Sequence, residues 1–181
     1  MIYTLCGASA SGKDMIQSIM INKYGINPIV SMTSRPMRVG EVDGREYIFV
    51  SDTEFKLMIK HDKLIEYREY NTANGIWYYG LPKMEFDDDK DYVVILDVNG
   101  TKDFIKCIGA DKCKIFHITC PREERTKRAM NRGSFDLTEW ERRLRADDED
   151  FSIDKFDGLD YTVINNYNRD INDVVKEILN T

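Results

Sequence analysis

Short apolar runs alternate with longer segments of helical periodicity along this chain. The apolar runs predict strands, at 2–6, 28–31, 92–97, 114–119 and 161–165. The segments between them predict helices, at 13–24, 99–108, 121–132 and 168–180. Continuously apolar strands that alternate with helices are typical of a parallel sheet covered on both faces. We therefore expect a three-layer α/β fold whose core is formed by residues 1–34, 92–120 and 151–181.

Two stretches depart from this alternation. Residues 35–91 predict an inserted, β-rich antiparallel lobe, with β-rich segments at 46–50, 64–70 and 76–80, a helix at 52–61 and a loop over 71–77. Residues 121–150 are highly charged and helical, and they predict a lid beside the core. At this length we expect 1–181 to form one domain.

Composition and charge narrow the class of partner. Hydrophobic residues make up 42% of the chain and charged residues 32%, as in ordinary soluble domains. We expect no membrane span and no signal peptide, because the apolar runs are short and the first residues are not basic. A net charge of -6 disfavours a nucleic-acid partner. The 4 cysteines have no zinc or CxxC spacing, so we expect free thiols and a cytoplasmic location.

A glycine-rich loop follows the first predicted strand. It has the Walker A pattern of P-loop NTPases and reads Gly7-Ala8-Ser9-Ala10-Ser11-Gly12-Lys13-Asp14. Backbone N–H groups of such a loop surround the phosphates of ATP, and Lys13 can bridge the β and γ phosphates. Asp14 stands where Ser or Thr is usual. Either its carboxylate ligates Mg²⁺ in place of a hydroxyl, or the site binds metal poorly; we expect the first.

Arginines gather in two places that suit small anionic ligands. Arg35 and Arg38 flank Pro36 closely enough to enclose one phosphate with their guanidinium groups. In the charged stretch, arginines recur on one predicted helix face, at positions 125, 128 and 132. Taken alone, either group could also be a solvated surface.

The segment around the first arginine pair resembles a known family. Its similarity to the monophosphate-binding segment of guanylate kinases is carried by Thr33-Ser34-Arg35-Pro36, Arg38, Gly40-Glu41-Val42-Asp43-Gly44, Tyr47 and Phe49-Val50. The resemblance extends over nearly the whole chain. It implies a P-loop NTPase fold and transfer of the γ-phosphoryl group of ATP, with Mg²⁺, to GMP or dGMP. The partners would be ATP and the monophosphate, with no nucleic acid and no membrane, and the protein would be a monomer or homodimer.

The resemblance also implies roles for individual side chains. The acceptor phosphate would be held by Arg35, Arg38, Tyr47 and Tyr79, with Glu41 orienting the two arginines or the acceptor. The rest of the acceptor site would comprise Ser31, Glu66, Asp97 and Asn99. The transferring phosphates would be contacted by Lys13, Arg128, Arg132 and Arg143, and the donor adenine by Asn165. Glu66 suits guanine, because a carboxylate accepts hydrogen bonds from the ring N–H and the exocyclic amine.

Some positions depart from the family pattern or allow another interpretation. Leu81 stands where a Ser or Thr usually contacts the purine, and Asn99 replaces an acid. These departures leave open a related P-loop kinase for another deoxynucleotide or a sugar phosphate, and a non-catalytic protein-binding module. Asp97 follows a predicted strand, so it could join a magnesium–water network, hold the acceptor-site arginines or cap the next helix.

Overall fold

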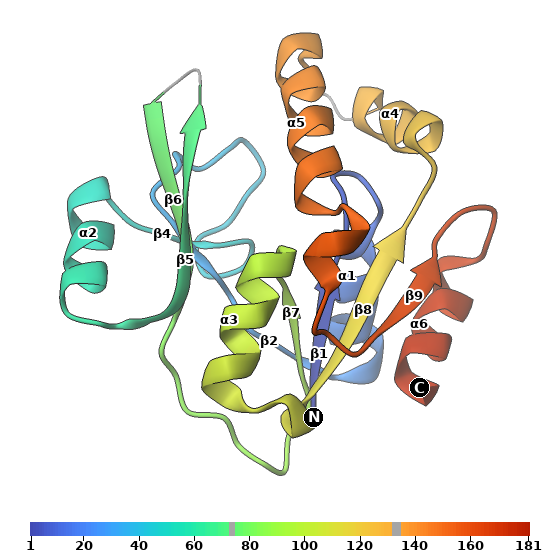
Figure 1. The fold of residues 1–181 in the computed structure, drawn as a ribbon, viewed down its shortest axis with the longest axis horizontal. Helices are drawn as coiled ribbons and strands as arrows, with labels where there is room; N and C mark the ends of the chain where they lie inside the picture. Colours follow the sequence, from blue (N-terminus) through green and yellow to red (C-terminus); the bar gives the residue numbers. More distant parts are fainter. Residues whose placement is uncertain (73–74, 132–134) are drawn as a thin grey trace.

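The core of the protein is a parallel sheet, seen in the computed structural model, which describes residues 1–72, 75–131 and 135–181 (Figure 1). Its strands are β1 (Ile2–Cys6), β2 (Asn27–Pro28), β7 (Tyr92–Ile95), β8 (Cys113–Thr119) and β9 (Tyr161–Asn165). They lie in the order β2-β7-β1-β8-β9, and every pair is parallel. This parallel sheet confirms the predicted α/β class. Its strand β1 coincides with the predicted apolar run at 2–6, and all five of its residues are buried.

Helices cover both faces of this sheet. Along β1, Tyr3 and Leu5 belong to the core cluster that includes α1 (Lys13–Tyr24) and α6 (Ile171–Asn180). The alternating residues Ile2 and Cys6 belong to clusters on the other face, beneath α3 (Val98–Ile108) and two short 3₁₀ turns, Ala110–Lys112 and Ile153–Phe156. β1 is therefore the central strand of a three-layer core.

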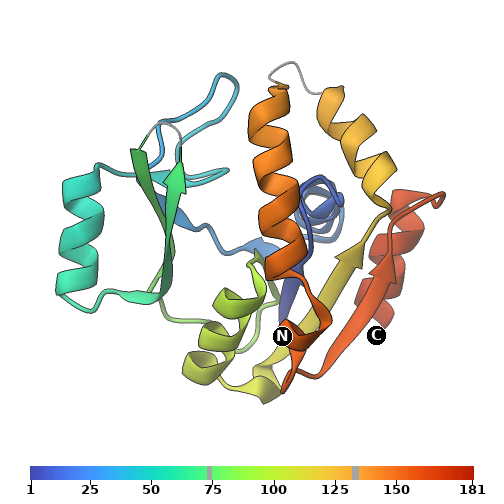
Figure 2. The ribbon, with the colours of Figure 1, turned by 45° about the horizontal axis from the view of Figure 1, so that its top comes forward.

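A second sheet forms the lobe at the left of Figures 1 and 2. Its strands are β3 (Met32–Thr33), β4 (Ile48–Phe49), β5 (Leu64–Thr72) and β6 (Gly75–Pro82), in the order β4-β3-β6-β5. The β3–β4 pair is parallel, so the lobe is mixed rather than wholly antiparallel. The helix α2 (Asp52–Lys60) closes its outer side, where Phe55 stacks on Tyr78 with ring centroids 5.4 Å apart.

Two local predictions are wrong. The predicted strand at 28–31 is divided, because β2 ends at Pro28 in the core sheet and β3 begins at Met32 in the lobe sheet. The run is apolar because Ile29 is buried in the core, but at this point the chain passes from one sheet to the other. The segment 71–77 is not a plain loop either. Its described residues extend the β5–β6 hairpin, and Tyr70 pairs with Trp77 across it.

The charged stretch forms two helices, α4 (Arg122–Met130) and α5 (Leu137–Asp150). Asp136 caps α5 by accepting a hydrogen bond from the Glu139 N–H at 2.7 Å. Figures 1 and 2 show both helices at the carboxyl end of β8, with α5 on the side that faces the lobe. In the described part of the chain, no helix has the length and apolar character needed to cross a membrane.

Candidate active site

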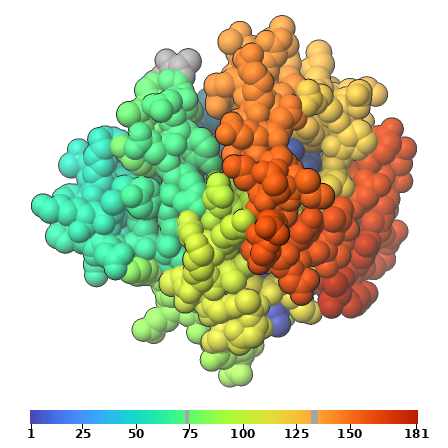
Figure 3. Space-filling view, viewed as in Figure 1, coloured from blue at the N-terminus to red at the C-terminus, as the bar shows by residue number. Residues whose placement is uncertain are grey.

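A cleft of about 320 Å³ lies between the lobe, α5 and the carboxyl ends of β1 and β7. The space-filling view shows the molecule hollowed between the β5–β6 hairpin and α5 (Figure 3). The cleft brings together many positions singled out from the sequence, namely Gly7, Ser9, Lys13, Ser31, Tyr47, Glu66, Tyr79, Asp97 and Arg143. This is the edge at which open α/β sheets bind their ligands.

The glycine-rich loop joins β1 to α1 in a tight turn. Gly12 is the N-cap of α1 at φ 103, in the left-handed region, and a Cβ there would collide with the amide of Asn166. Gly7 has φ +150, and a Cβ there would collide with the carbonyl of Ile118 in β8. The glycines therefore let the loop pass close to its neighbours, with the positive end of α1 beside the cleft.

Lys13 lies within this loop, as the Walker A pattern predicts. Its Nζ donates to the carbonyl oxygens of Gly7 at 2.6 Å and Ala8 at 2.9 Å. Burial lowers the pKa of Lys13, and the charges of Asp14 and Asp147 oppose that effect. The ammonium group is thus held by neutral carbonyl groups beside the cleft.

Asp14 is exposed on the first turn of α1. Its charge acts on Lys13 and also raises the pKa of Tyr47 in the lobe, so it lies near the space between them. Within residues 1–72, 75–131 and 135–181, no group of three His, Cys, Asp or Glu side chains could hold a metal ion. A single carboxylate beside a phosphate-binding loop nevertheless fits Mg²⁺, which commonly takes one or two carboxylates together with phosphate oxygens.

Arg128 and Asn166 brace the loop from the side of β9. Arg128 donates to the carbonyl oxygens of Ser11 at 3.2 Å and Asn166 at 3.0 Å. The amide of Asn166 donates to the same Ser11 carbonyl at 2.8 Å. Asn165, predicted to contact the donor adenine, is exposed at the end of β9, and its buried neighbour Asn166 makes the loop contact. Arg132 lies outside the described residues.

A buried ion pair ties the lid to the loop. Arg125 of α4 and Asp147 of α5 are 6% and 8% exposed, and their charged groups are 2.8 Å apart. Asp147 also accepts hydrogen bonds from the Ser9 N–H at 3.0 and 3.1 Å, and Arg125 donates to the Ser9 carbonyl at 3.2 Å. The lid helices are therefore joined to each other and to the phosphate-binding loop.

Arg35 is held rigidly behind the lobe wall of the cleft. It is 3% exposed, and both of its terminal nitrogens bind the Glu41 carboxylate, at 2.8 and 2.9 Å. Its guanidinium packs over the rings of Tyr47 and Phe49, each 5.4 Å away. The Arg35 hydrogen bond lowers the pKa of Glu41, and Glu41 also accepts from the Arg38 N–H at 2.7 Å. Glu41 therefore holds the Arg35 side chain and the Arg38 backbone in place.

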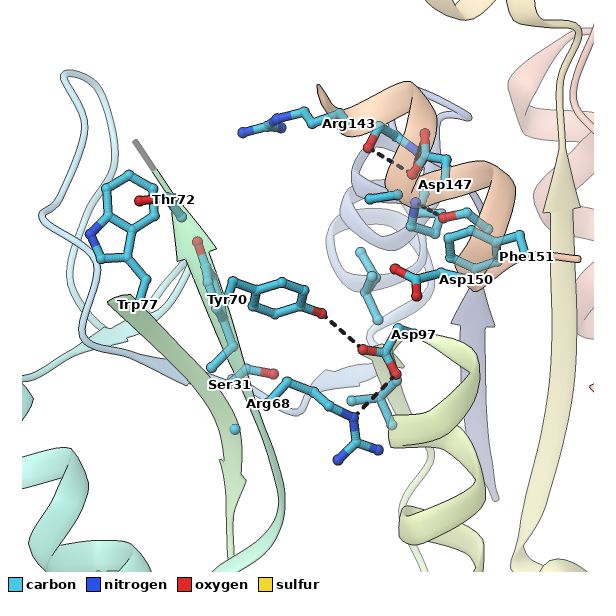
Figure 4. A pocket seen from close by; sticks show the side chains of 18 of the residues that line it. Ser31, Arg68, Tyr70, Thr72, Trp77, Asp97, Arg143, Asp147, Asp150 and Phe151 are labelled. Carbon is cyan, nitrogen blue, oxygen red and sulfur yellow. Dashed lines mark hydrogen bonds and ion pairs between the residues drawn. The ribbon is translucent and has the colours of Figure 1, made fainter. Parts of the chain in front are cut away.

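Positive charge converges from the lobe and the lid. Partial burial lowers the pKa of Arg38, and the charges of Arg35 and Arg143 lower it further. Arg143 extends from α5 toward the lobe (Figure 4). Glu139 accepts from Arg143 at 2.9 Å and from Arg142 at 2.8 and 2.9 Å, and these contacts lower the pKa of Glu139 to about 2. Arginines that repel one another across a cleft favour an anion between them.

Three tyrosines line the lobe side. Tyr79 packs edge to face on Tyr47 at 5.6 Å and on Tyr70 at 5.5 Å. Burial raises the pKa of Tyr47 to about 12, so its hydroxyl stays protonated and can donate a hydrogen bond to a phosphate. Tyr70 points across the cleft and donates to Asp97 at 3.0 Å (Figure 4).

The inner end of the cleft is acidic and partly closed by α3. Glu66 is 8% exposed, and burial raises its pKa to about 7. Gly100 leaves room for it, since a Cβ there would come within 3.2 Å of the carboxylate. Asp97 caps α3 by accepting from the Gly100 N–H at 2.5 Å, so of its alternatives the helix cap is observed. Asn99 lies exposed on the first turn of α3.

Several cleft residues were not singled out from the sequence, namely Arg68, Tyr70, Trp77, Arg142, Asp147 and Asp150. Arg68 and Tyr70 follow Glu66 at spacings of two, so strand alternation could have identified them. Asp147 offers no such signal, because it stands among other acids of a charged helix. Leu81 is fully buried and packs in the core cluster with Leu96 and Phe104.

Together these features define an α/β nucleotide-binding protein with a P-loop, an inserted lobe and a helical lid. A family model described as guanylate kinase matches residues 1–181. The chain is 32% identical over 185 residues to guanylate kinase of Lactobacillus johnsonii, covering 99% of this chain and 87% of that protein. It is also 32% identical over 170 residues to guanylate kinase of Novosphingobium aromaticivorans, covering 91% and 74%. The chain therefore belongs to the guanylate kinase family.

Solved structures agree with this assignment. The crystal structure of guanylate kinase from Anaplasma phagocytophilum superposes with a TM-score of 0.72 at 25% identity, covering 99% of this chain and 82% of that chain. A gluconokinase from Sinorhizobium meliloti 1021 has a TM-score of 0.51 at 11% identity, covering 98% of this chain and 89% of that chain. The second likeness shows a shared fold alone.

Proposed function

We propose that this protein transfers the γ-phosphoryl group of ATP to GMP or dGMP. Family membership supports the reaction. One observation carries the arrangement: Lys13 of the P-loop and Tyr47, Tyr79 and Glu66 of the lobe line a single cleft. Direct transfer requires the donor and acceptor phosphates to meet in line, and a shared cleft meets that requirement without a covalent intermediate.

The donor half would consist of the loop from Gly7 to Asp14. Lys13 can exchange the carbonyl oxygens of Gly7 and Ala8 for the β and γ phosphates, because an ammonium binds charged oxygens more strongly. Asp14 would hold Mg²⁺, which would neutralise charge on the phosphates when bound. Arg128 and Asn166 would keep the loop in shape during binding.

The acceptor half would belong to the lobe. Arg38, Tyr47 and Tyr79 would bind the acceptor phosphate, and Glu41 would hold Arg35 in support. Glu66 would accept hydrogen bonds from the guanine N1–H and exocyclic amine, with Ser31 nearby. Adenine presents an acceptor at its N1, so the ionised carboxylate would disfavour it.

The lid would complete the site. Arg143 already extends toward the lobe from α5, and its guanidinium would stabilise charge on the phosphoryl group during transfer. Closure of α5 over the cleft would exclude water, which prevents hydrolysis of ATP. We further propose that the chain forms one domain with a core, a lobe and a lid. The protein would act in the cytoplasm as a monomer or homodimer. Its partners would be ATP and the monophosphate, with no nucleic acid and no membrane.

A coupled assay of ADP formation tests the proposal. Purified protein with ATP and Mg²⁺ is given GMP, dGMP, AMP, other deoxynucleoside monophosphates or sugar phosphates in turn. We expect the highest kcat/KM with GMP or dGMP, and no turnover in Lys13→Met. A clear preference for another acceptor, or no turnover and no ATP binding by calorimetry, would overturn it.

A further inference from the structure

Arg68 lies among three carboxylates at the inner end of the cleft. Its guanidinium binds Asp103 at 2.8 Å and lies 3.8 Å from Asp97 and 3.9 Å from Glu66. It also donates to the Tyr67 carbonyl at 2.6 Å. Figure 4 shows Arg68 extending from β5 toward Asp97. One guanidinium therefore lies close to three carboxylates, one from the lobe and two from the start of α3.

We propose that Arg68 sets purine selectivity at the acceptor site by favouring the carboxylate form of Glu66, which only accepts hydrogen bonds. Arg68 acts through Glu66 and is therefore a positioning residue. The inference rests on the proposed function, since it assumes that Glu66 meets the base of the monophosphate.

The surroundings of Glu66 show why it needs this cation. Burial raises the pKa of Glu66, and the carboxylates of Asp97, which caps α3, and of Asp103, within α3, raise it further. Arg68, on the same strand as Glu66, lowers it. Without Arg68, burial and the two acids would act unopposed, and Glu66 would be protonated near neutral pH.

Anchoring keeps the charge where it acts. Arg68 is only 24% exposed, and its contacts with Asp103 and the Tyr67 carbonyl fix the guanidinium from two sides. Its 3.9 Å separation from Glu66 is too long for a hydrogen bond, so the effect is electrostatic and leaves the Glu66 oxygens available to a ligand.

The protonation state of Glu66 decides which purine edge it matches. A carboxylate accepts from the N1–H and the exocyclic amine of guanine. A carboxylic acid can instead donate to the N1 of adenine while accepting from its N6 amine. Loss of Arg68 should therefore weaken the binding of GMP and strengthen the binding of AMP. High pH should reverse both effects, because it ionises Glu66.

The test compares KM and kcat for GMP and AMP between pH 6.5 and 9 in wild type, Arg68→Met and Arg68→Lys. We expect Arg68→Met to raise KM for GMP roughly tenfold at pH 7, with a much smaller change at pH 9. The GMP-to-AMP ratio of kcat/KM should fall, kcat at saturating GMP should change little, and Arg68→Lys should restore most of the wild-type pattern. Lys83→Met, which removes an exposed ion pair with Asp62, controls for lost charge.

An unchanged KM in Arg68→Met, or the same increase at every pH, would overturn the inference. Thermal unfolding of each variant checks the fold, and Arg68→Gln is a second neutral variant if Arg68→Met does not fold. In a Glu66→Gln background, Arg68→Met should have no further pH-dependent effect, and a persisting effect would also overturn it. Failure of the proposed function looks different, because wild type itself would then not use GMP or dGMP.

Discussion

Asp147 accepts the backbone N–H of Ser9, so a lid helix is bonded directly to the phosphate-binding loop. The same carboxylate is paired with Arg125, which reaches the Ser9 carbonyl. A change in α5 is thereby transmitted to the P-loop.

Asp147→Ala should lower the free energy of unfolding by about 3 kcal/mol, because it leaves Arg125 buried without its partner. KM for ATP should rise severalfold as Ser9 loses its acceptor. Urea denaturation and steady-state kinetics measure the two effects. The matched control is Asp148→Ala, whose exposed pair with Arg122 should contribute less than about 1 kcal/mol. Equal losses in the two variants would contradict the prediction.

Glu41→Gln should raise KM for GMP about tenfold and leave KM for ATP nearly unchanged. The amide cannot accept both Arg35 nitrogens, so Arg35 loses its bidentate anchor within the proposed acceptor site. Initial rates at varied GMP and at varied ATP separate the two constants. Glu46→Gln changes a nearby carboxylate that pairs with exposed Arg45, and it should leave both constants unchanged. A shift in KM for ATP alone would show that Glu41 serves the donor site.

Glu66→Gln should stabilise the protein at pH 8 while weakening GMP binding. The pKa of Glu66 is raised from 4.5 to about 7 on folding, so the folded protein holds this proton more tightly than the unfolded chain. Its ionisation therefore destabilises the fold increasingly as pH rises from about 4.5 to 7, and constantly above that, by on the order of 3 kcal/mol.

Urea denaturation of wild type and Glu66→Gln at pH 5 and pH 8 checks this expectation, with the larger gain at pH 8. Glu69→Gln is the control, since it makes the same chemical change at an exposed position of the same strand. A gain of equal size at both pH values would show that Glu66 is not the titrating group.

Asp14→Ala should raise the Mg²⁺ concentration needed for half-maximal rate, whereas Asp14→Ser should be tolerated because a hydroxyl can also ligate the ion. Rates at fixed ATP over a Mg²⁺ series measure the change. An alanine variant with unchanged Mg²⁺ dependence would exclude the role.

The apolar pattern predicted the core well, because β1 and β7 are buried almost throughout and consist mostly of apolar residues. The predicted strand 2–6 and helix 13–24 agree with β1 and α1. The pattern failed at 28–31, where Ile29 and Met32 are both buried but in different layers. Burial alone does not reveal that the chain leaves one sheet for another.

The site was predictable where chemistry imposes a local pattern. The loop ending in Lys13 and the Arg35–Glu41 segment could be recognised, because their functional residues are close together in the sequence at a characteristic spacing. Asp147 acquires its partner Ser9 only when α5 packs against the P-loop, which is distant in the chain, so no local pattern marks it. Asn165 and Asn166 are adjacent and chemically identical, and only the three-dimensional course of β9 shows which one faces the loop.

The chain enters the lobe between β2 and β3 and leaves it between β6 and β7, so residues 32–82 form one continuous insertion. A single continuous insertion could in principle be exchanged, as a cassette, for the corresponding segment of another kinase in order to change the acceptor. The cassette is incomplete, however, since Asp97, Gly100 and Asp103 surround Glu66 and Arg68 from α3. A chimaera that exchanges the lobe must therefore also bring the first two turns of α3, and acceptor choice must evolve jointly in both segments.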